Sequence, residues 1–304
     1  MLRKPKLMWY WTERGFGSEL LYMLNAILYA EKHKLDFKLI SCYSNISTGI
    51  GWREYFQSFT EEKKMPYPFF RLFYTVYEVG ILNYLFGIEI KLLYGLFAQT
   101  NTTIWRYLYN EKFELEYFSS SKYGIDKVPC HEALQILLKK IWQPNAALSE
   151  ILSNEREKHP LTKDCFAVHL RHGDKVSGIY KECDAVENRF LYDHINSLGL
   201  DFSQLYILSD DHQKFKEFAD LCNGKSILTH CEETHRGYSN IDFLRLSGAV
   251  RKKEMITLLV SIDAAVRAKY FIGPYTSNVS KVIYLLRNGV GCYNSELRPF
   301  RIFY

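Results

Sequence analysis

Residues 169–175 (HLRHGDK) contain the side chains best suited to bind a phosphorylated ligand. The planar guanidinium of Arg171 can bind a diphosphate through two parallel hydrogen bonds, and it stays charged at any working pH. Asp174 can orient that guanidinium or the ammonium of Lys175. The segment therefore predicts an anion-binding turn, and a solvated loop of charged residues is the alternative.

A second polar segment, Ser209-Asp210-Asp211, follows the apolar residues Leu205–Leu208. Paired carboxylates can hold a metal ion that bridges a diphosphate. Asp210 or Asp211 can equally accept hydrogen bonds from the first backbone amides of the next helix. We favour the capping interpretation because capping is the commoner role of such acids, and because the segment contains no DxD pattern we expect no metal at this site.

A third polar segment, residues 273–278 (GPYTSN), precedes the helical pattern of Val279–Arg287. The start of a helix offers backbone amides and a favourable dipole to an anion, and here hydroxyl groups add further donors. We therefore expect Tyr275, Thr276, Ser277 and Asn278 to contact the anion. The alternative is that Ser277 only caps the helix.

Each of these segments follows a short apolar stretch in the second half of the chain. The stretches alternate with segments of helical periodicity, which predicts a parallel sheet with right-handed crossovers. In such a sheet ligands bind beyond the carboxyl ends of the strands. The expected strands are Phe166–Leu170, Leu205–Leu208, Ser226–Leu228 and Tyr270–Ile272, and the expected helices are Ala185–Leu198, Asp211–Cys222 and Glu254–Ala268.

The first half of the chain is expected to be helical and irregular. An amphipathic helix is predicted over Ser18–Lys32, a short strand over Phe37–Ile40, and a second helix over Glu132–Trp142, which Pro144 ends. A chain of 304 residues is too long for one ordinary core. We therefore predict two domains, residues 1–158 and 159–304.

The composition excludes several classes of protein. The net charge is +5 with Lys and Arg scattered along the chain, which argues against a nucleic-acid-binding protein. The apolar segment Pro66–Phe97 carries Arg71, Glu78, Glu89 and Lys91, so we expect no integral membrane segment. The seven cysteines contain no CxxC pair and are expected to be reduced. We expect a cytoplasmic protein and leave peripheral membrane association open.

Five segments, in order, resemble motifs of the α1,6-fucosyltransferases, which include the animal core enzymes and the rhizobial nodulation enzymes. Residues 169–176 (HLRHGDKV) resemble the family's HxRRxDK(V), and residues 209–211 match its (T/S)DD. Residues 276–279 (TSNV) stand in place of SSQV. Residues 15–20 (GFGSEL) are similar to GYGxQL, and residues 51–56 (GWREYF) to GGWExxF. The resemblance covers most of the chain.

The resemblance implies an α/β, GT-B-like fold, with an open α/β N-terminal domain for a glycan acceptor and a Rossmann-type C-terminal domain for GDP-fucose. It also implies an inverting transfer without metal or cofactor. By carry-over, Arg171 holds the β-phosphate, His169 lies near the ribose and base, Asp211 supports the site, and Ser277 contacts the diphosphate. The turn with Gly15 and Gly17 would also belong to the donor site.

Two positions of the donor site depart from the family pattern. His172 stands where the family has a second arginine, so one cationic contact is weaker or depends on pH. An acid upstream of Tyr270 is needed to bind the guanine edge, and Asp263 is the candidate, although it can also be a surface charge.

The catalytic base is the third departure. The family's glutamate would fall on Gly178 or Ile179, and Glu182 is the nearest acid, with Asp184 and Glu187 behind it. The expected reaction is a single displacement, in which the base removes the acceptor's proton while Arg171 and Lys175 stabilise the departing GDP.

Two other functions remain open. One is an α1,2- or protein O-fucosyltransferase, or another GDP-sugar transferase, because His172-Gly173-Asp174 is closer to the HxRxGD form of those enzymes. The other is a catalytically silent protein that binds a nucleotide sugar or a glycan, because the expected glutamate is displaced.

We predict that Glu182→Gln lowers kcat by ~10²–10⁴-fold, the usual contribution of a general base. Donor affinity should hardly change, because the amide keeps the shape of the side chain and loses only its basicity. Asp184→Asn and Glu187→Gln test the two acids behind it, and a loss of kcat in one of these variants instead would assign the base to that residue. A transferase that keeps full kcat in all three variants would contradict a base in this segment.

Overall fold

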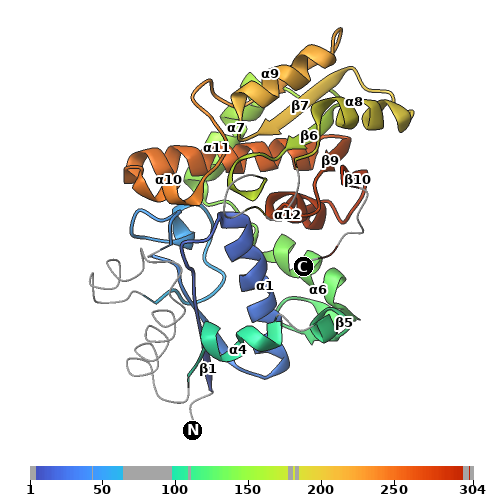
Figure 1. The fold of residues 1–304 in the computed structure, drawn as a ribbon. Coiled ribbons are helices and arrows are strands. Elements are labelled where there is room, and N and C mark those ends of the chain that lie inside the picture. Colours follow the sequence, from blue (N-terminus) through green and yellow to red (C-terminus); the bar gives the residue numbers. More distant parts are fainter. Residues whose placement is uncertain are drawn as a thin grey trace. The chain divides into compact units, whose positions relative to one another are not determined.

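The computed structural model describes residues 5–42, 44–63, 98–108, 111–176, 181, 185–296 and 301 (Figure 1). The chain divides into two compact units, residues 1–147 and 148–302. This boundary lies before the expected one, because helix α7 (Ala146–Lys158) mostly belongs to the second unit. Arg156 of α7 forms an ion pair with Asp263, and Oε2 of Glu155 lies 3.2 Å from Nε2 of His230, both within that unit.

The second unit is built on a five-stranded sheet in the order β10-β9-β6-β7-β8, in which every neighbouring pair is parallel. Its further elements in chain order are β6 (Phe166–Leu170), η2 (Gly173–Lys175), α8 (Asn188–Ser197), β7 (Gln204–Ser209), α9 (His212–Leu221), β8 (Ser226–Thr229), α10 (Asn240–Arg245), α11 (Gly248–Arg267), β9 (Tyr270–Gly273), α12 (Asn278–Leu286) and β10 (Cys292–Asn294).

Helices cover both faces of this sheet (Figure 1). Successive strand residues point to opposite faces, and Phe166 and Val168 belong to one buried core with apolar residues of α8 and α9. On the other face His169 contacts Ser280 of α12, and Tyr206 contacts Ser261 of α11. This is a doubly wound α/β unit, as the alternation of strands and helices predicted.

Arg287, at the end of α12, fixes the point where α11 ends and β9 begins. Its Nη1 donates to the carbonyl oxygens of Ala265 at 2.9 Å and Val266 at 3.0 Å, and also to Ala268, while Nη2 donates to Lys269 at 2.8 Å. The last carbonyls of a helix have no partner within the helix. One guanidinium therefore satisfies several of them, and its positive charge suits the negative end of the helix dipole.

The first unit contains a three-stranded parallel sheet in the order β2-β1-β3. We predicted the strand near Phe37 but not β1, and the description of this half as helical and irregular was wrong in that respect. Its elements are β1 (Lys6–Tyr10), α1 (Phe16–Lys32), β2 (Asp36–Ile40), η1 (Trp52–Glu54), β3 (Gln99–Thr100), α4 (Asn101–Leu108), α5 (Glu111–Glu114), β4 (Tyr117–Ser120), β5 (Ile125–Pro129) and α6 (Cys130–Ile141).

The missed strand β1 has a physical explanation. Leu7 to Tyr10 are all buried, and a strand that is covered on both faces shows a continuous apolar run instead of an alternating pattern. Among the described residues, no helix combines the length and the apolar character that crossing a bilayer requires. The segment Pro66–Phe97 lies outside the described residues.

Candidate functional site

The candidate site lies where β6, β7 and β9 of the second unit end. Leu170 pairs with Ser209, and Val168 with Ile272, so the carboxyl ends of the three strands are adjacent. The three polar segments found in the sequence follow directly on these ends. The topology therefore brings residues 169–175 and 209–211 together, beside residues 273–278. They lie at the edge of the sheet where ligands of doubly wound units bind.

The carboxylate of Asp210 connects three parts of this site. Its Oδ2 accepts from Nη1 of Arg171 and, at 3.2 Å, from the backbone amide of Tyr238, while Oδ1 accepts from the amide of His172 at 2.9 Å. Its own carbonyl oxygen accepts from the amide of Gly237 at 2.7 Å. Asp210 thus fixes the turn after β6 and a loop that follows β8.

Arg171 is held between two carboxylates and an aromatic ring. Besides its ion pair with Asp210, its Nη2 lies 2.9 Å from Oδ1 of Asp174, and the guanidinium lies 5.6 Å from the centre of the Tyr238 ring. Only 13% of the Arg171 side chain is exposed. The charge is therefore fixed in one position, which is what recognition of a phosphate group through a planar fork requires.

The loop with Tyr238 was not predicted to belong to the site. The carbonyl of Tyr238 accepts from the amide of Asp174 at 2.9 Å, and Oδ2 of Asp174 accepts from the amide of Asn240 at 3.1 Å. Gly173 has a φ of +79°, and a Cβ on it would lie 2.2 Å from the Tyr238 oxygen. On the other side, a Cβ on Gly237 would lie 2.8 Å from the Cα of Gly173. Only two glycines allow this backbone contact.

His169 is buried at the floor of the site. Its Nδ1 lies 2.7 Å from Oγ of Ser280, a fully buried residue of α12. Burial, together with the nearby charge of Arg171, lowers the pKa of His169 to about 3. Its imidazole is therefore neutral at pH 7 and can offer a ligand one donor or one acceptor but no charge.

His172 is also buried, and burial lowers its pKa below the usual value near 6.5. It is therefore neutral at pH 7. At that pH, His172 does not replace the positive charge of the arginine expected at its position.

The segment after β9 is tied to the C-terminal part of the chain. Glu296 accepts from the amide of Thr276 at 3.0 Å and also from its hydroxyl, and Asn294 accepts from the amide of Tyr275 at 3.3 Å. Ser277 is buried and precedes α12, but its side chain forms no capping hydrogen bond there. The interpretation of Ser277 as a simple side-chain cap is therefore wrong. Asn278 is the first residue of the helix.

The two remaining acids of the predicted donor site have structural partners. Oδ1 of Asp211 accepts from the amide of Lys214 at 3.0 Å and caps α9, as the capping interpretation expected. Asp263 lies on α11, where its two carboxylate oxygens are paired with Arg156 and Arg267. Asp263 does not line the pocket described below.

Other predicted residues lie elsewhere. Gly15 precedes helix α1 of the first unit and Gly17 lies in its first turn. The backbone of Lys175 is in η2, while its side chain, like Glu182 and Asp184, lies outside the described residues. Glu187 is exposed and precedes α8.

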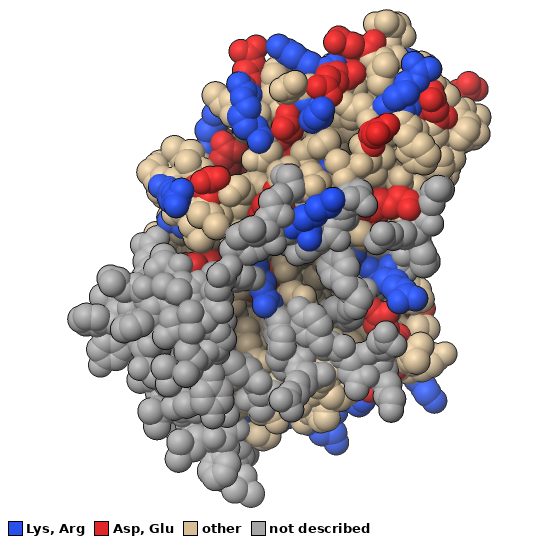
Figure 2. Space-filling model, in the orientation of Figure 1, with Lys and Arg blue, Asp and Glu red and all other residues tan. Residues whose placement is uncertain are grey.

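A pocket opens at the turn after β6. Polar groups of His169, Arg171, His172, Ser295 and Glu296 line it, together with apolar side chains that include Val186, Leu191 and Pro274. No sequence pattern marked Ser295 and Glu296, which reach the pocket because they follow β10, the edge strand beside β9. Figure 2 shows that acidic and basic side chains are intermixed on the visible described surface of the second unit and do not gather by sign.

We predict that Gly173→Ala lowers the free energy of unfolding more than Gly199→Ala does. Gly199 also has a positive φ, of +63°, but an added Cβ would have nothing within 4 Å. Gly199→Ala therefore measures the cost of backbone strain alone, about 1–2 kcal/mol. The additional loss in Gly173→Ala then reports the clash with Tyr238. Urea unfolding of both variants measures the difference, and equal losses would show that the Gly173–Tyr238 contact is not tight.

The chain matches no protein-family model and no curated protein sequence. It is similar in structure to fucosyltransferase NodZ from Bradyrhizobium, with a TM-score of 0.56 and 12% identity over 93% of this chain and 94% of that one. For NodZ α1,6-fucosyltransferase co-crystallised with GDP, the TM-score is 0.54 and the identity is 13%, over 93% of each chain.

Two further fucosyltransferase structures are similar to this chain. A mutant of Arabidopsis thaliana FUT1 in complex with GDP has a TM-score of 0.55 and 10% identity, over 99% of this chain and 72% of that one. POFUT1 in complex with GDP has a TM-score of 0.52 and 14% identity, over 97% of this chain and 99% of that one. The expected fold class is thereby confirmed: the chain has the α/β, GT-B-like fold that these fucosyltransferases share.

Proposed function

We propose that this protein is a glycosyltransferase of the α1,6 type that moves fucose from GDP-fucose to a hydroxyl of a glycan acceptor, with inversion. The observation that carries the proposal is the fixed Arg171, held by Asp210 and Asp174 at the carboxyl edge of the sheet. The fold adds support, since structures of NodZ and POFUT1 that share it contain GDP or GDP-fucose.

In this proposal the diphosphate binds beside Arg171, with Ser277 and the first turn of α12 on its other side. The guanidinium offers a planar fork, and the start of α12 adds the positive end of a helix dipole. Tyr275, Thr276 and Asn278 belong to the same segment. His169 would lie near the ribose and base as a neutral group, and Lys175 would add a second charge.

The chemistry would be a single displacement at the anomeric carbon. The bond from that carbon to the β-phosphate oxygen breaks as the bond to the acceptor oxygen forms, and the acceptor's proton passes to a carboxylate. We assign that role to Glu182 on the family resemblance. Arg171 and Lys175 would stabilise the charge that grows on the leaving GDP, and Asp174 would position Arg171.

Roles for Gly15 and Gly17 at the donor, and for Asp263 at the guanine edge, rest on the resemblance alone. For Asp263 the role requires that the carboxylate exchange at least one of its two arginine partners for the base. The His172-Gly173-Asp174 sequence keeps an α1,2- or protein O-fucosyltransferase as the second candidate. A binding protein without catalysis would take up GDP-fucose but release no GDP when acceptor is added.

We predict that Arg171→Lys lowers donor kcat/KM at least ~10²-fold, because an ammonium cannot reproduce the bidentate fork. The lysine keeps a positive charge between Asp174 and Asp210, whereas Arg171→Ala would leave the two carboxylates uncompensated and would also reduce stability. GDP release from GDP-fucose and calorimetric GDP binding are the measurements.

The matched control is Arg189→Lys, which changes an arginine of the same unit whose side chain is 70% exposed. Wild-type turnover and GDP affinity in Arg171→Lys would refute the assignment of the donor site.

We further predict that turnover is the same with and without added Mg²⁺ or Mn²⁺. The acids of the Ser209-Asp210-Asp211 segment already accept hydrogen bonds from Arg171 and from three backbone amides, one of which lies in the first turn of α9. A metal would have to displace these donors. A strict requirement for Mn²⁺ that Asp210→Asn abolishes would contradict this account.

A further inference from the structure

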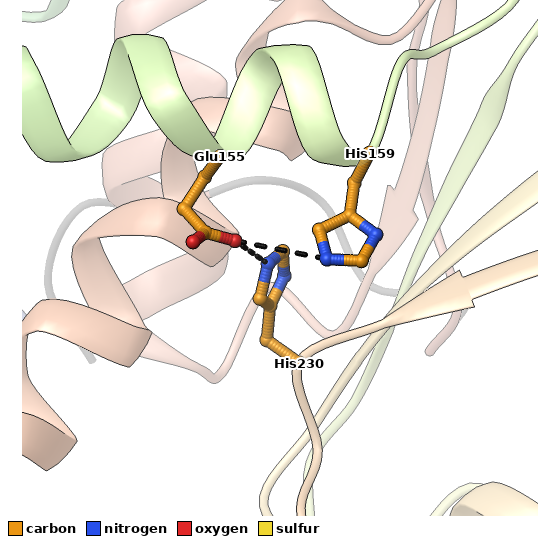
Figure 3. A group of neighbouring side chains, drawn as sticks. All are labelled: Glu155, His159 and His230. Atoms are coloured by element: carbon orange, nitrogen blue, oxygen red, sulfur yellow. Dashed lines mark hydrogen bonds and ion pairs between the residues drawn. The ribbon is translucent and has the colours of Figure 1, made fainter.

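A group of three possible metal ligands lies outside the donor site. Glu155 lies in the last turn of α7, His159 directly follows that helix, and His230 directly follows β8, so that all three side chains converge (Figure 3). Oε2 of Glu155 lies 3.2 Å from Nε2 of His230 and 3.7 Å from Nε2 of His159. None of the three lines the pocket at β6.

We propose that Glu155, His159 and His230 bind a divalent transition-metal ion of the zinc class. Two imidazoles and one carboxylate are a common ligand set for Zn²⁺, with a fourth position left for water. Bond lengths of about 2.0–2.1 Å in a tetrahedron place ligand atoms ~3.3 Å apart. The ligand atoms here lie within 4.8 Å of one another, so small side-chain rotations suffice.

Neighbouring groups already aim the ligand atoms at a common point. Lys158 contacts Oε1 of Glu155 at 3.2 Å, which leaves Oε2 directed toward the two histidines. The hydroxyl of Tyr206 lies 2.7 Å from Nδ1 of His230 and donates to Oγ of Ser261 at 3.1 Å. A hydrogen bond to the second ring nitrogen is the usual way in which proteins orient a metal-binding histidine.

The contacts inside the group meet at one atom, Oε2 of Glu155. Nε2 of His230 lies 3.2 Å from it and Nε2 of His159 lies 3.7 Å from it. A metal ion bound there by the carboxylate and the two neutral imidazoles would replace these contacts and would satisfy all three side chains together.

Metal at this position would connect helix α7 to the loop that leads to Tyr238. His230 is the first residue of that loop, and Gly237 and Tyr238 further along it bond to Asp210. The expected role is therefore structural: the metal would be a cross-link that holds this loop against helix α7.

The test is titration of the full-length, tag-free protein with Co²⁺, a coloured substitute for Zn²⁺. We expect one equivalent to bind with the visible absorption of a low-symmetry four- or five-coordinate site, and Zn²⁺ to displace it. His159→Ala should weaken Co²⁺ binding at least a hundredfold, and Tyr206→Phe, which removes only the orienting hydroxyl, ten- to a hundredfold.

His194→Ala, which removes a histidine of α8 in the same unit, is the matched control and should bind Co²⁺ as the wild type does. Circular dichroism checks the fold, and His159→Gln replaces His159→Ala if the latter does not fold. The proposal is overturned if the wild type takes up no stoichiometric Co²⁺. It is also overturned if the folded His159 variant binds Co²⁺ with unchanged affinity and spectrum.

Discussion

The organisation of the candidate site depends on one carboxylate, that of Asp210. Its two oxygens accept from a guanidinium and from two backbone amides of separate segments. Charge-assisted hydrogen bonds of this kind are about twice as strong as neutral ones, and they join the turn after β6 to the loop after β8. Because Asp210 follows directly on β7, the rigid sheet fixes it, and through it the two loops.

Arg171 dominates the electrostatics of the pocket. Burial keeps His169 and His172 neutral at pH 7, so Arg171 is the positively charged group among the described residues that line the pocket. Asp210 and Asp174 offset that charge through their ion pairs with Arg171. An anionic ligand therefore has to compete with fixed carboxylates, which favours a ligand with several anionic oxygens that also reaches the start of α12.

Much of the second unit could be predicted from local sequence, and β6 has the predicted bounds. Helix α11 begins at Gly248, earlier than the expected start at Glu254, and Ser247 caps this start, because its side chain accepts from the amide of Val250. Strand β1 was missed because burial on both faces removes the alternating pattern. Tyr238 and Glu296 were missed because long-range pairing brings them to the site, and no periodicity or local motif marks such pairs.

The contact between Gly173 and Gly237 also limits how this sequence can diverge. A side chain at either position would meet the backbone of the other loop, so neither glycine can be replaced unless both loops move. Distant relatives that keep this loop arrangement should therefore share a glycine after the strand-end arginine and a second one before the aromatic residue that packs on it.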